Sequence, residues 1–216
     1  MKGKVVILDK ISERMMELCE SYLHPDFELV FCLSEEDQNQ HVDTADVLVT
    51  FTNGISPSLL SRAVQCRFIQ KLGAGVNNID IEGATSRNIP VANTAGLNAT
   101  AVAEHTVALM SAILKHLITA HNKIIYEGEW LKTGLRDRSY QLSYKKVGLV
   151  GFGNIGRQVR RILRGYECEV YYYDVYRLPP EEEEQLGVQF LNLDQLIETV
   201  DGVSLHVPLN EHTHHL

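Results

Sequence analysis

Short apolar runs alternate with segments of helical periodicity along the first part of the chain, up to Asn93. The runs predict buried strands over residues 5–8, 27–31, 46–50, 68–72 and 89–93. Helices are predicted between them over residues 12–23, 57–64 and 80–87, the second with Ser56 as N-cap and Pro57 at its first position. Strands that alternate with helices indicate a parallel sheet covered on both faces, and hence one small α/β domain.

The longest helical pattern runs from Ala99 to about Tyr126. Apolar residues recur there at three- and four-residue spacing, and further apolar residues fill most of the remaining circumference. A helix that is apolar nearly all round is buried, so this one is expected to lie between two domains.

A second α/β series follows a polar loop at residues 127–140. Strands are predicted over residues 147–150, 169–173, 188–191 and 203–207, and helices over residues 155–164, 181–186 and 193–200. The four glutamates at 181–184 suit the positive end of a helix dipole, and they are interpreted as a solvated helix start.

A glycine-rich sequence, Gly151-Phe152-Gly153-Asn154-Ile155-Gly156, joins the first strand of this series to its helix. In a G-x-G-x-x-G turn the first glycine permits a tight bend, the second lets a pyrophosphate approach the backbone, and the third lets the helix pack close to the strand. Asp174 ends the next strand, near the spacing of roughly 20 residues expected for an acid that binds the adenosine ribose. A carboxylate there favours NAD over NADP, although Arg177 could moderate its repulsion of a 2′-phosphate.

Composition narrows the choice of partners. Hydrophobic residues make up 44% and charged residues 22% of the 216 residues, as in an ordinary globular protein. The formal net charge of −8 argues against nucleic acid or an anionic membrane as a partner. The four cysteines form no CxxC pair, and no apolar stretch approaches the roughly 20 residues of a membrane span, which together predict a soluble, cytoplasmic protein without a structural metal.

Three segments together resemble the D-isomer-specific 2-hydroxyacid dehydrogenases, a family that includes phosphoglycerate dehydrogenases and glyoxylate and hydroxypyruvate reductases. They are Lys71–Asp80, Val91–Thr106, and the stretch from Val147 through Gly156 and Asp174 to Leu209. The resemblance implies two doubly wound parallel-sheet domains. Residues 1–97 would form a flavodoxin-like substrate domain, and residues 98–216 an NAD-binding Rossmann domain that is incomplete at its C-terminal end.

The resemblance also implies the site residues. The backbone of Ala74, Gly75 and Val76 would bind the substrate carboxylate, with Asn98 close by. Cofactor contacts are expected at Val102, Thr106, Gly151, Phe152, Gly153, Asn154, Ile155, Gly156, Asp174, His206, Val207 and Pro208.

Simpler interpretations remain open for several of these residues. Asn98 can be only a helix N-cap, and Gly73 and Gly75 can merely shape a turn. A single histidine after an apolar strand, such as His206, is more often structural than functional. Lys71 is either a solvated charge or a hint of an anionic substrate such as phosphoglycerate.

No catalytic residue is assigned. Reduction of a 2-keto acid needs a cation and a general acid tuned by a carboxylate, which in the family are an arginine, a glutamate or aspartate, and a histidine placed after the Val-Pro-Leu strand. The sequence ends at Leu216 before any of them, so this chain by itself is expected to be inactive and to expose an apolar strand edge. His105 is interpreted as a helix-packing residue, and the histidines at 212, 214 and 215 match no common metal site.

Two functions therefore stay open. The favoured one is an oxidoreductase that transfers a hydride between NAD(H) and a small 2-hydroxy or 2-keto acid, with 3-phosphoglycerate among the candidates. The alternative is an NAD-binding interaction protein without turnover, similar to the co-repressor relatives of the family. The resemblance implies a homodimer for the full-length protein, formed through the long helix region.

Overall fold

The computed structural model describes residues 2–216, which divide into two compact units. The first unit runs up to Ala95 and includes Leu209–Leu216, and the second comprises Gly96–Pro208. The boundary thus lies two residues before the predicted one between residues 97 and 98. Hydrogen bonds explain the shift, because Thr94 N–H donates to a carbonyl of the first unit, Gly73 O, at 3.1 Å, whereas Gly96 O accepts from Ala99 N–H, also at 3.1 Å.

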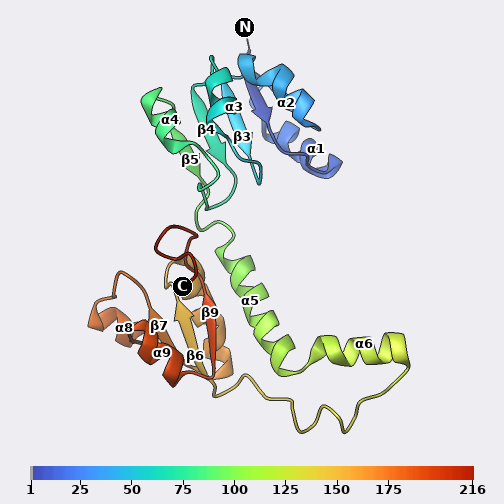
Figure 1. Ribbon diagram of the computed structural model, residues 1–216, viewed down its shortest axis with the longest axis vertical. Helices are drawn as coiled ribbons and strands as arrows, with labels where there is room; N and C mark the ends of the chain where they lie inside the picture. The colour runs from blue at the N-terminus through green and yellow to red at the C-terminus, as the bar shows by residue number, and fades with distance from the viewer. Residues whose placement is uncertain (1) are drawn as a thin grey trace. The chain divides into compact units, whose positions relative to one another are not determined.

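The first unit is built on a five-stranded parallel sheet (Figure 1). Its strands are β1 (Gly3–Ile7), β2 (Phe27–Phe31), β3 (Val47–Thr50), β4 (Phe68–Lys71) and β5 (Val91–Asn93). Their order in the sheet is β2-β1-β3-β4-β5, which is the flavodoxin-like order. The predicted fold of this part is therefore confirmed.

Four short helices complete the first unit: α1 (Glu13–Tyr22), α2 (Glu35–His41), α3 (Pro57–Arg62) and α4 (Ile81–Ser86). Each begins at a side chain that accepts a backbone N–H, as N-caps do, and these side chains belong to Ser12, Ser34, Ser56 and Asp80. The sequence did not predict α2, because all seven of its residues are polar and none is buried, so it carries no hydrophobic period.

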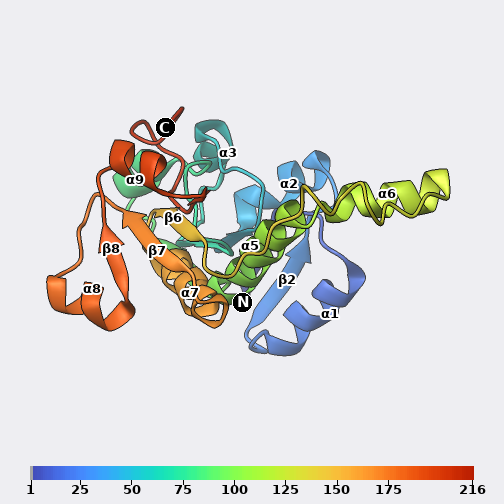
Figure 2. The same ribbon diagram turned by 90° about the horizontal axis from the view of Figure 1, so that it is seen from below.

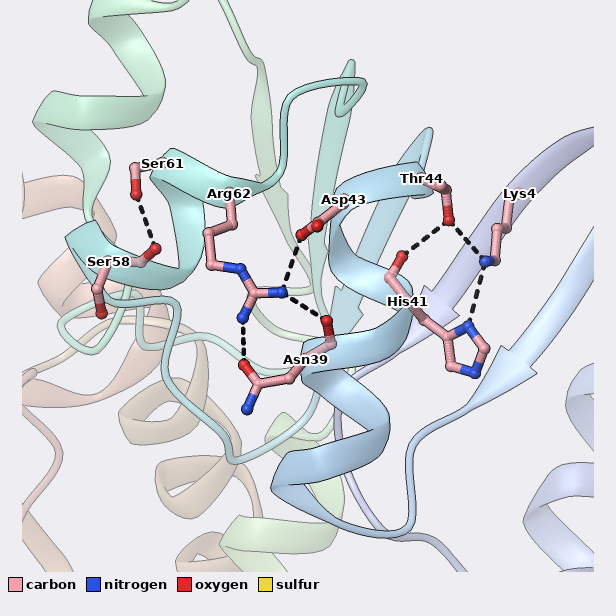
Figure 3. A network of polar contacts seen from close by, with 8 residues as sticks. All are labelled: Lys4, Asn39, His41, Asp43, Thr44, Ser58, Ser61 and Arg62. Carbon is pink, nitrogen blue, oxygen red and sulfur yellow. Dashed lines mark hydrogen bonds and ion pairs between the residues drawn. The ribbon is translucent and has the colours of Figure 1, made fainter.

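Polar contacts hold α2 and the turn after it, η1 (Val42–Thr44), against their neighbours (Figure 3). The Arg62 guanidinium donates to Asp43 at 3.0 Å and also bonds Asn39. Lys4 Nζ donates to Thr44 Oγ1 at 2.7 Å. These contacts position α2 although it buries no side chain.

The second unit contains a four-stranded parallel sheet made of β6 (Lys146–Val150), β7 (Glu169–Tyr173), β8 (Val188–Phe190) and β9 (Gly202–Leu205). The order β8-β7-β6-β9 is the 3-2-1-4 order of the Rossmann fold, as predicted. Its helices are α7 (Asn154–Leu163), α8 (Pro180–Leu186) and α9 (Leu193–Thr199). The chain reverses strand order between β6 and β9, and ligands of such sheets bind beyond the carboxyl ends of the strands at this point.

The predicted single helix over residues 99–126 is wrong. It is two helices, α5 (Ala99–Leu114) and α6 (Leu117–Glu127), bent by 65° at a break where His116 takes a left-handed φ of 49°. Burial on all sides is also wrong, since the buried residues of α5 are Ala99, Ala103 and Val107. Within residues 2–216 no single helix is long and apolar enough to cross a membrane, and α5 and α6 pass that test only as a bent pair.

A buried carboxylate fixes the loop after β3. Asp9, which is 3% exposed, accepts the backbone N–H groups of Phe51, Thr52 and Asn53 at 2.6–2.7 Å. Lys71 Nζ donates to the Phe51 carbonyl at 2.6 Å. Burial alone would raise the pKa of Asp9. The hydrogen bonds from the Thr52 hydroxyl and from the backbone N–H groups of residues 51–53 outweigh this effect and lower the pKa below its usual value.

We expect Asp9→Asn to lower the free energy of unfolding by about 2–3 kcal/mol at neutral pH. The NH2 group of the amide is a donor, so it cannot accept the N–H groups that the carboxylate accepts. A lowered pKa in the folded state means that this stabilisation is present above the unfolded-state pKa and is lost as the pH falls through the folded-state value. Urea unfolding should therefore show a gap between wild type and variant that closes below about pH 4. Asp26→Asn, at a carboxylate whose side chain is 84% exposed, is the control. Equal stability of Asp9→Asn and wild type at neutral pH would contradict this role.

Candidate cofactor-binding site

The turn between β6 and α7 lies against the ends of two other strands, β7 and β9. Gly151 has a φ of +92°, and a Cβ on it would lie 2.7 Å from His206 C and 2.8 Å from His206 O, just after β9. Its N–H donates to Tyr173 O at the end of β7, and His206 N–H donates to Val150 O. Only glycine fits at this position, because both the backbone conformation and the close approach exclude a side chain.

The other two glycines of the turn have different surroundings. A Cβ on Gly156 would lie 2.5 Å from Gly151 O, so this glycine lets α7 pack against the turn. A Cβ on Gly153 would meet no atom within 4 Å. The backbone at Gly153 therefore faces open space, into which a ligand could approach closely.

The N-terminus of α7 points its backbone N–H groups at this space. Gly153 is the N-cap, and no side chain caps the helix. The first N–H groups of an α-helix have no partner inside the helix and carry its positive dipole end, which suits a phosphate. The turn thus has the shape and the donors to hold the diphosphate of a dinucleotide.

Asp174 lies at the end of β7 beside the same turn. Its Oδ2 accepts Phe152 N–H at 2.7 Å and its Oδ1 accepts Tyr176 N–H at 3.0 Å. The carboxylate is half-buried, and each oxygen has a further lone pair with which to accept a ribose hydroxyl. The expected pyrophosphate turn and ribose acid are therefore joined by a direct hydrogen bond.

The remaining residues of the turn contribute in different ways. Phe152 is 3% exposed and its ring packs on Tyr172 with ring centroids 4.7 Å apart, so its side chain is not accessible to a ligand. Its N–H already donates to Asp174. The Asn154 amide lies beside Gly96, where a Cβ would approach Asn154 Nδ2 to 2.7 Å. Ile155 is partly buried and packs against the core of the second unit.

Val102 and Thr106 lie one helical turn apart on α5, and both are half-buried. Thr106 Oγ1 donates to Val102 O at 2.8 Å. The hydroxyl proton is thereby used within the helix, so Thr106 can meet a cofactor as an acceptor.

The backbone of the segment after β9 lies against Gly151. Burial lowers the pKa of His206, and its buried Nε2 has no hydrogen-bond partner within the described residues 2–216. His206 is therefore neutral at physiological pH. Val207 N lies 3.0 Å from the position of a Cβ on residue 151, and Pro208 is the last residue of the second unit.

The expected substrate residues divide between the two units. Ala74, Gly75 and Val76 form the loop after β4, where Ala74 O accepts Asn93 Nδ2 at 2.8 Å and Ala74 and Gly75 are exposed. Asn98 stands at the N-cap position of α5 but its side chain makes no capping bond, so capping does not occupy it.

Two interpretations of charged residues need correction. Lys71 is 5% exposed and bonded to Phe51 O, so it is not a solvated charge. The glutamate run is not simply a solvated helix start, because Glu182 pairs with Arg157 and Glu183 with Arg177. Nothing in the local pattern distinguished these two glutamates from their neighbours, since one partner lies on α7 and the other in the loop after β7.

Comparison with known proteins agrees with this geometry. The family model described as "D-isomer specific 2-hydroxyacid dehydrogenase, NAD binding domain" matches residues 107–216. The chain belongs to this family. Its second unit is accordingly an NAD-binding domain, and NAD is the cofactor that the turn and Asp174 fit.

Relatives of the whole chain carry related names. A glyoxylate reductase of Thermococcus litoralis is 33% identical over 225 residues, which cover 100% of this chain and 67% of that protein. A D-3-phosphoglycerate dehydrogenase of Methanocaldococcus jannaschii is 30% identical over 215 residues, 99% of this chain and 40% of that protein. The crystal structure of a Pyrococcus horikoshii protein superposes with a TM-score of 0.72 at 32% identity, covering 100% of this chain and 65% of that one. The chain thus spans about two thirds of the length of the glyoxylate reductase.

The surroundings of the glycines predict opposite outcomes for two variants. Gly153→Ala should fold normally but weaken NADH binding about tenfold or more, because its methyl group enters the space that the diphosphate needs. Gly151→Ala should instead lose at least about 1–3 kcal/mol of stability, because its backbone conformation disfavours alanine and the added Cβ would lie 2.7 Å from His206 C.

Thermal unfolding and titration calorimetry with NADH separate the two effects. Gly165→Ala, at a glycine that also has no atom within 4 Å of an added Cβ, is the control and should change neither quantity. A folded Gly153→Ala protein that binds NADH as tightly as wild type would show that the cofactor does not approach this turn.

Proposed function

We propose that the protein transfers a hydride between NAD(H) and a small 2-hydroxy or 2-keto acid. The observation that supports this most is the hydrogen bond between Phe152 N–H and Asp174, which joins the phosphate turn to the ribose acid. The nicotinamide of the bound cofactor would supply or accept the hydride. The residues of the second unit would hold the diphosphate at Gly153 and the ribose at Asp174.

The substrate carboxylate is assigned to the loop at Ala74, Gly75 and Val76. Within residues 2–216 the backbone N–H groups of these residues have no hydrogen-bond acceptor, and Ala74 and Gly75 are exposed. Lys71, next to the loop, is buried and donates to Phe51 O, so its ammonium group does not lie at the surface where a phosphate would bind. We therefore favour small acids such as glyoxylate or hydroxypyruvate over 3-phosphoglycerate, in line with the names of several relatives.

Cofactor binding and turnover can be tested with one variant and its control. Asp174→Asn keeps the shape of the side chain but removes the charge that the ribose hydroxyls would meet, so NADH affinity should fall about tenfold. Asp194→Asn, at an exposed acid of α9, should leave it unchanged. Calorimetry measures the affinity. Because no general acid is assigned within residues 2–216, turnover is measured on the longest natural product of the gene, as the loss of NADH absorbance with glyoxylate, hydroxypyruvate or 3-phosphohydroxypyruvate.

Each result decides between the candidate functions. Reduction of glyoxylate or hydroxypyruvate that is faster than that of the phosphorylated acid supports the proposal. Tight NADH binding without turnover of any of the three acids would overturn it in favour of an interaction protein that binds NAD. Absence of NADH binding would overturn both.

We further propose that two copies associate through α6. Figures 1 and 2 show α6 and the loop after it running out from the rest of the second unit. None of its residues is buried, and Ile118 and Ile125 are 67% and 61% exposed. A helix of this length is marginally stable in water unless an apolar face is covered. A second copy supplies a self-complementary cover, since twofold interfaces pair the same surface on both partners.

Replacement of Ile118 and Ile125 by serine should convert a dimer to a monomer, because it removes two apolar side chains from the proposed contact. Sedimentation velocity measures the association state. Val64→Ser, at a 68% exposed residue of the first unit, is the control and should leave the dimer intact. A monomeric wild-type protein would refute the proposed contact.

A further inference from the structure

The loop after Asp174 carries an arginine that is fixed in place. Arg177 Nε donates to Glu183 Oε1 at 2.9 Å and Arg177 Nη2 donates to Glu183 Oε2 at 3.1 Å. The guanidinium also lies over the Phe190 ring, 5.1 Å from its centroid. Paired hydrogen bonds and ring stacking together fix both the position and the plane of an arginine head group.

The carboxylate that holds Arg177 is itself anchored to the core. The Glu183 side chain is 12% exposed, whereas that of Arg177 is 57% exposed. Tyr172, which is fully buried, donates its hydroxyl to Glu183 Oε1 at 2.8 Å and accepts Leu178 N–H at 2.8 Å. Glu183 is thus the fixed partner and Arg177 the group whose position it sets.

The pKa values agree with this arrangement. Burial, with help from the bond to Glu183, raises the pKa of Tyr172 to about 12, so its hydroxyl remains a donor at physiological pH. The hydrogen bonds from Arg177 are the main cause of a lowered pKa at Glu183. The pair is therefore ionised across the physiological range.

An arginine near the ribose acid is the residue type that accommodates the 2′-phosphate of NADP in dinucleotide-binding folds. Arg177 follows Asp174 by three residues and would serve this purpose if its guanidinium were free. Here two of its five N–H donors are used by Glu183, which also neutralises its charge. A 2′-phosphate would then meet the carboxylate of Asp174, while the guanidinium of Arg177 stays paired with Glu183.

We propose that Glu183 determines cofactor preference by holding Arg177 away from the adenosine ribose, so that NAD is accepted and NADP is rejected. This inference rests on the proposed cofactor site. It assigns a specificity role to a residue of α8 that contacts Arg177 and Tyr172 rather than the turn.

Release of Arg177 should make the site accept NADP. In Glu183→Gln the amide oxygen still accepts the Tyr172 hydroxyl, but the charge that holds the guanidinium is gone. NADPH affinity should rise about tenfold, the effect of one new charge-assisted contact, while NADH affinity stays within about twofold of wild type. Glu184→Gln removes the same charge from an exposed neighbouring position and should change neither affinity.

A double variant separates release of the arginine from the simple loss of a negative charge. If freed Arg177 binds the 2′-phosphate, Glu183→Gln combined with Arg177→Gln should return NADPH affinity to that of Arg177→Gln alone. If charge alone matters, the gain should persist in the double variant. Calorimetry with NADH and NADPH on all five proteins supplies the affinities, and circular dichroism with thermal melting shows that each is folded.

Glu183→Asp provides a second variant should Glu183→Gln fail to fold, since it keeps the charge but shortens the reach to Arg177. An intermediate gain in NADPH affinity supports the proposal. An unchanged NADPH-to-NADH ratio in a folded Glu183 variant, a gain that survives in the double variant, or equal binding of both cofactors by wild type would refute it while the NAD site stands. Failure of the wild type to bind NADH would refute the cofactor site itself, and the inference with it.

Discussion

The close approach of three strand ends at Gly151 is the constraint on which the second unit depends. The turn after β6 is bonded to the end of β7 through Gly151 N–H and Tyr173 O, and the residue after β9 comes within 3 Å of where a Cβ would stand. A side chain here would push β9 from β6 and open the sheet at its topological switch point. The packing of β6, β7 and β9 therefore requires glycine here, and under the proposed function the same bend would also shape the turn that holds the diphosphate.

Each unit has an aspartate just after the end of a parallel strand, but the two carboxylates differ in burial and in hydrogen bonding. Asp9 follows β1, next to β3, and Asp174 follows β7, next to β6. Asp9 is 3% exposed and its oxygens are occupied by the N–H groups of residues 51–53 and by hydroxyls, so it fixes a loop. Asp174 accepts only two backbone N–H groups within residues 2–216 and is half-buried, which leaves it able to meet a ligand. The number of internal donors thus separates an acid whose oxygens are used within the fold from one that keeps lone pairs for a ligand.

On α8, a residue outside the proposed cofactor site contacts an arginine near it. The helix presents consecutive glutamates, yet Glu183 is the one that lies against Tyr172 and Arg177. Its effect on a bound cofactor would be exerted through the position of the arginine. Such an arrangement depends on the packing of α8 beside β7 and β8 rather than on any feature of the glycine turn.

The sequence by itself determined the strands, most of the helices, the N-cap at Ser56, and the spacing from the glycine turn to Asp174. These are local properties, set by side-chain periodicity and by residues a few positions apart. The break at His116 was not predicted because apolar periodicity continues across it. Helix α2 was not predicted because it has no apolar face.

Only the tertiary structure decided that Lys71 is buried, that Phe152 N–H binds Asp174, and that Glu183 holds Arg177. The first two of these contacts join the ends of neighbouring strands, whose proximity is created by the order of strands in a sheet. The third joins residues six positions apart, and it depends on how α8 packs against Tyr172. Hydrophobic patterns specify that a strand is buried but not which charged side chain a distant loop will meet, so pairing of this kind emerges only when the chain is packed.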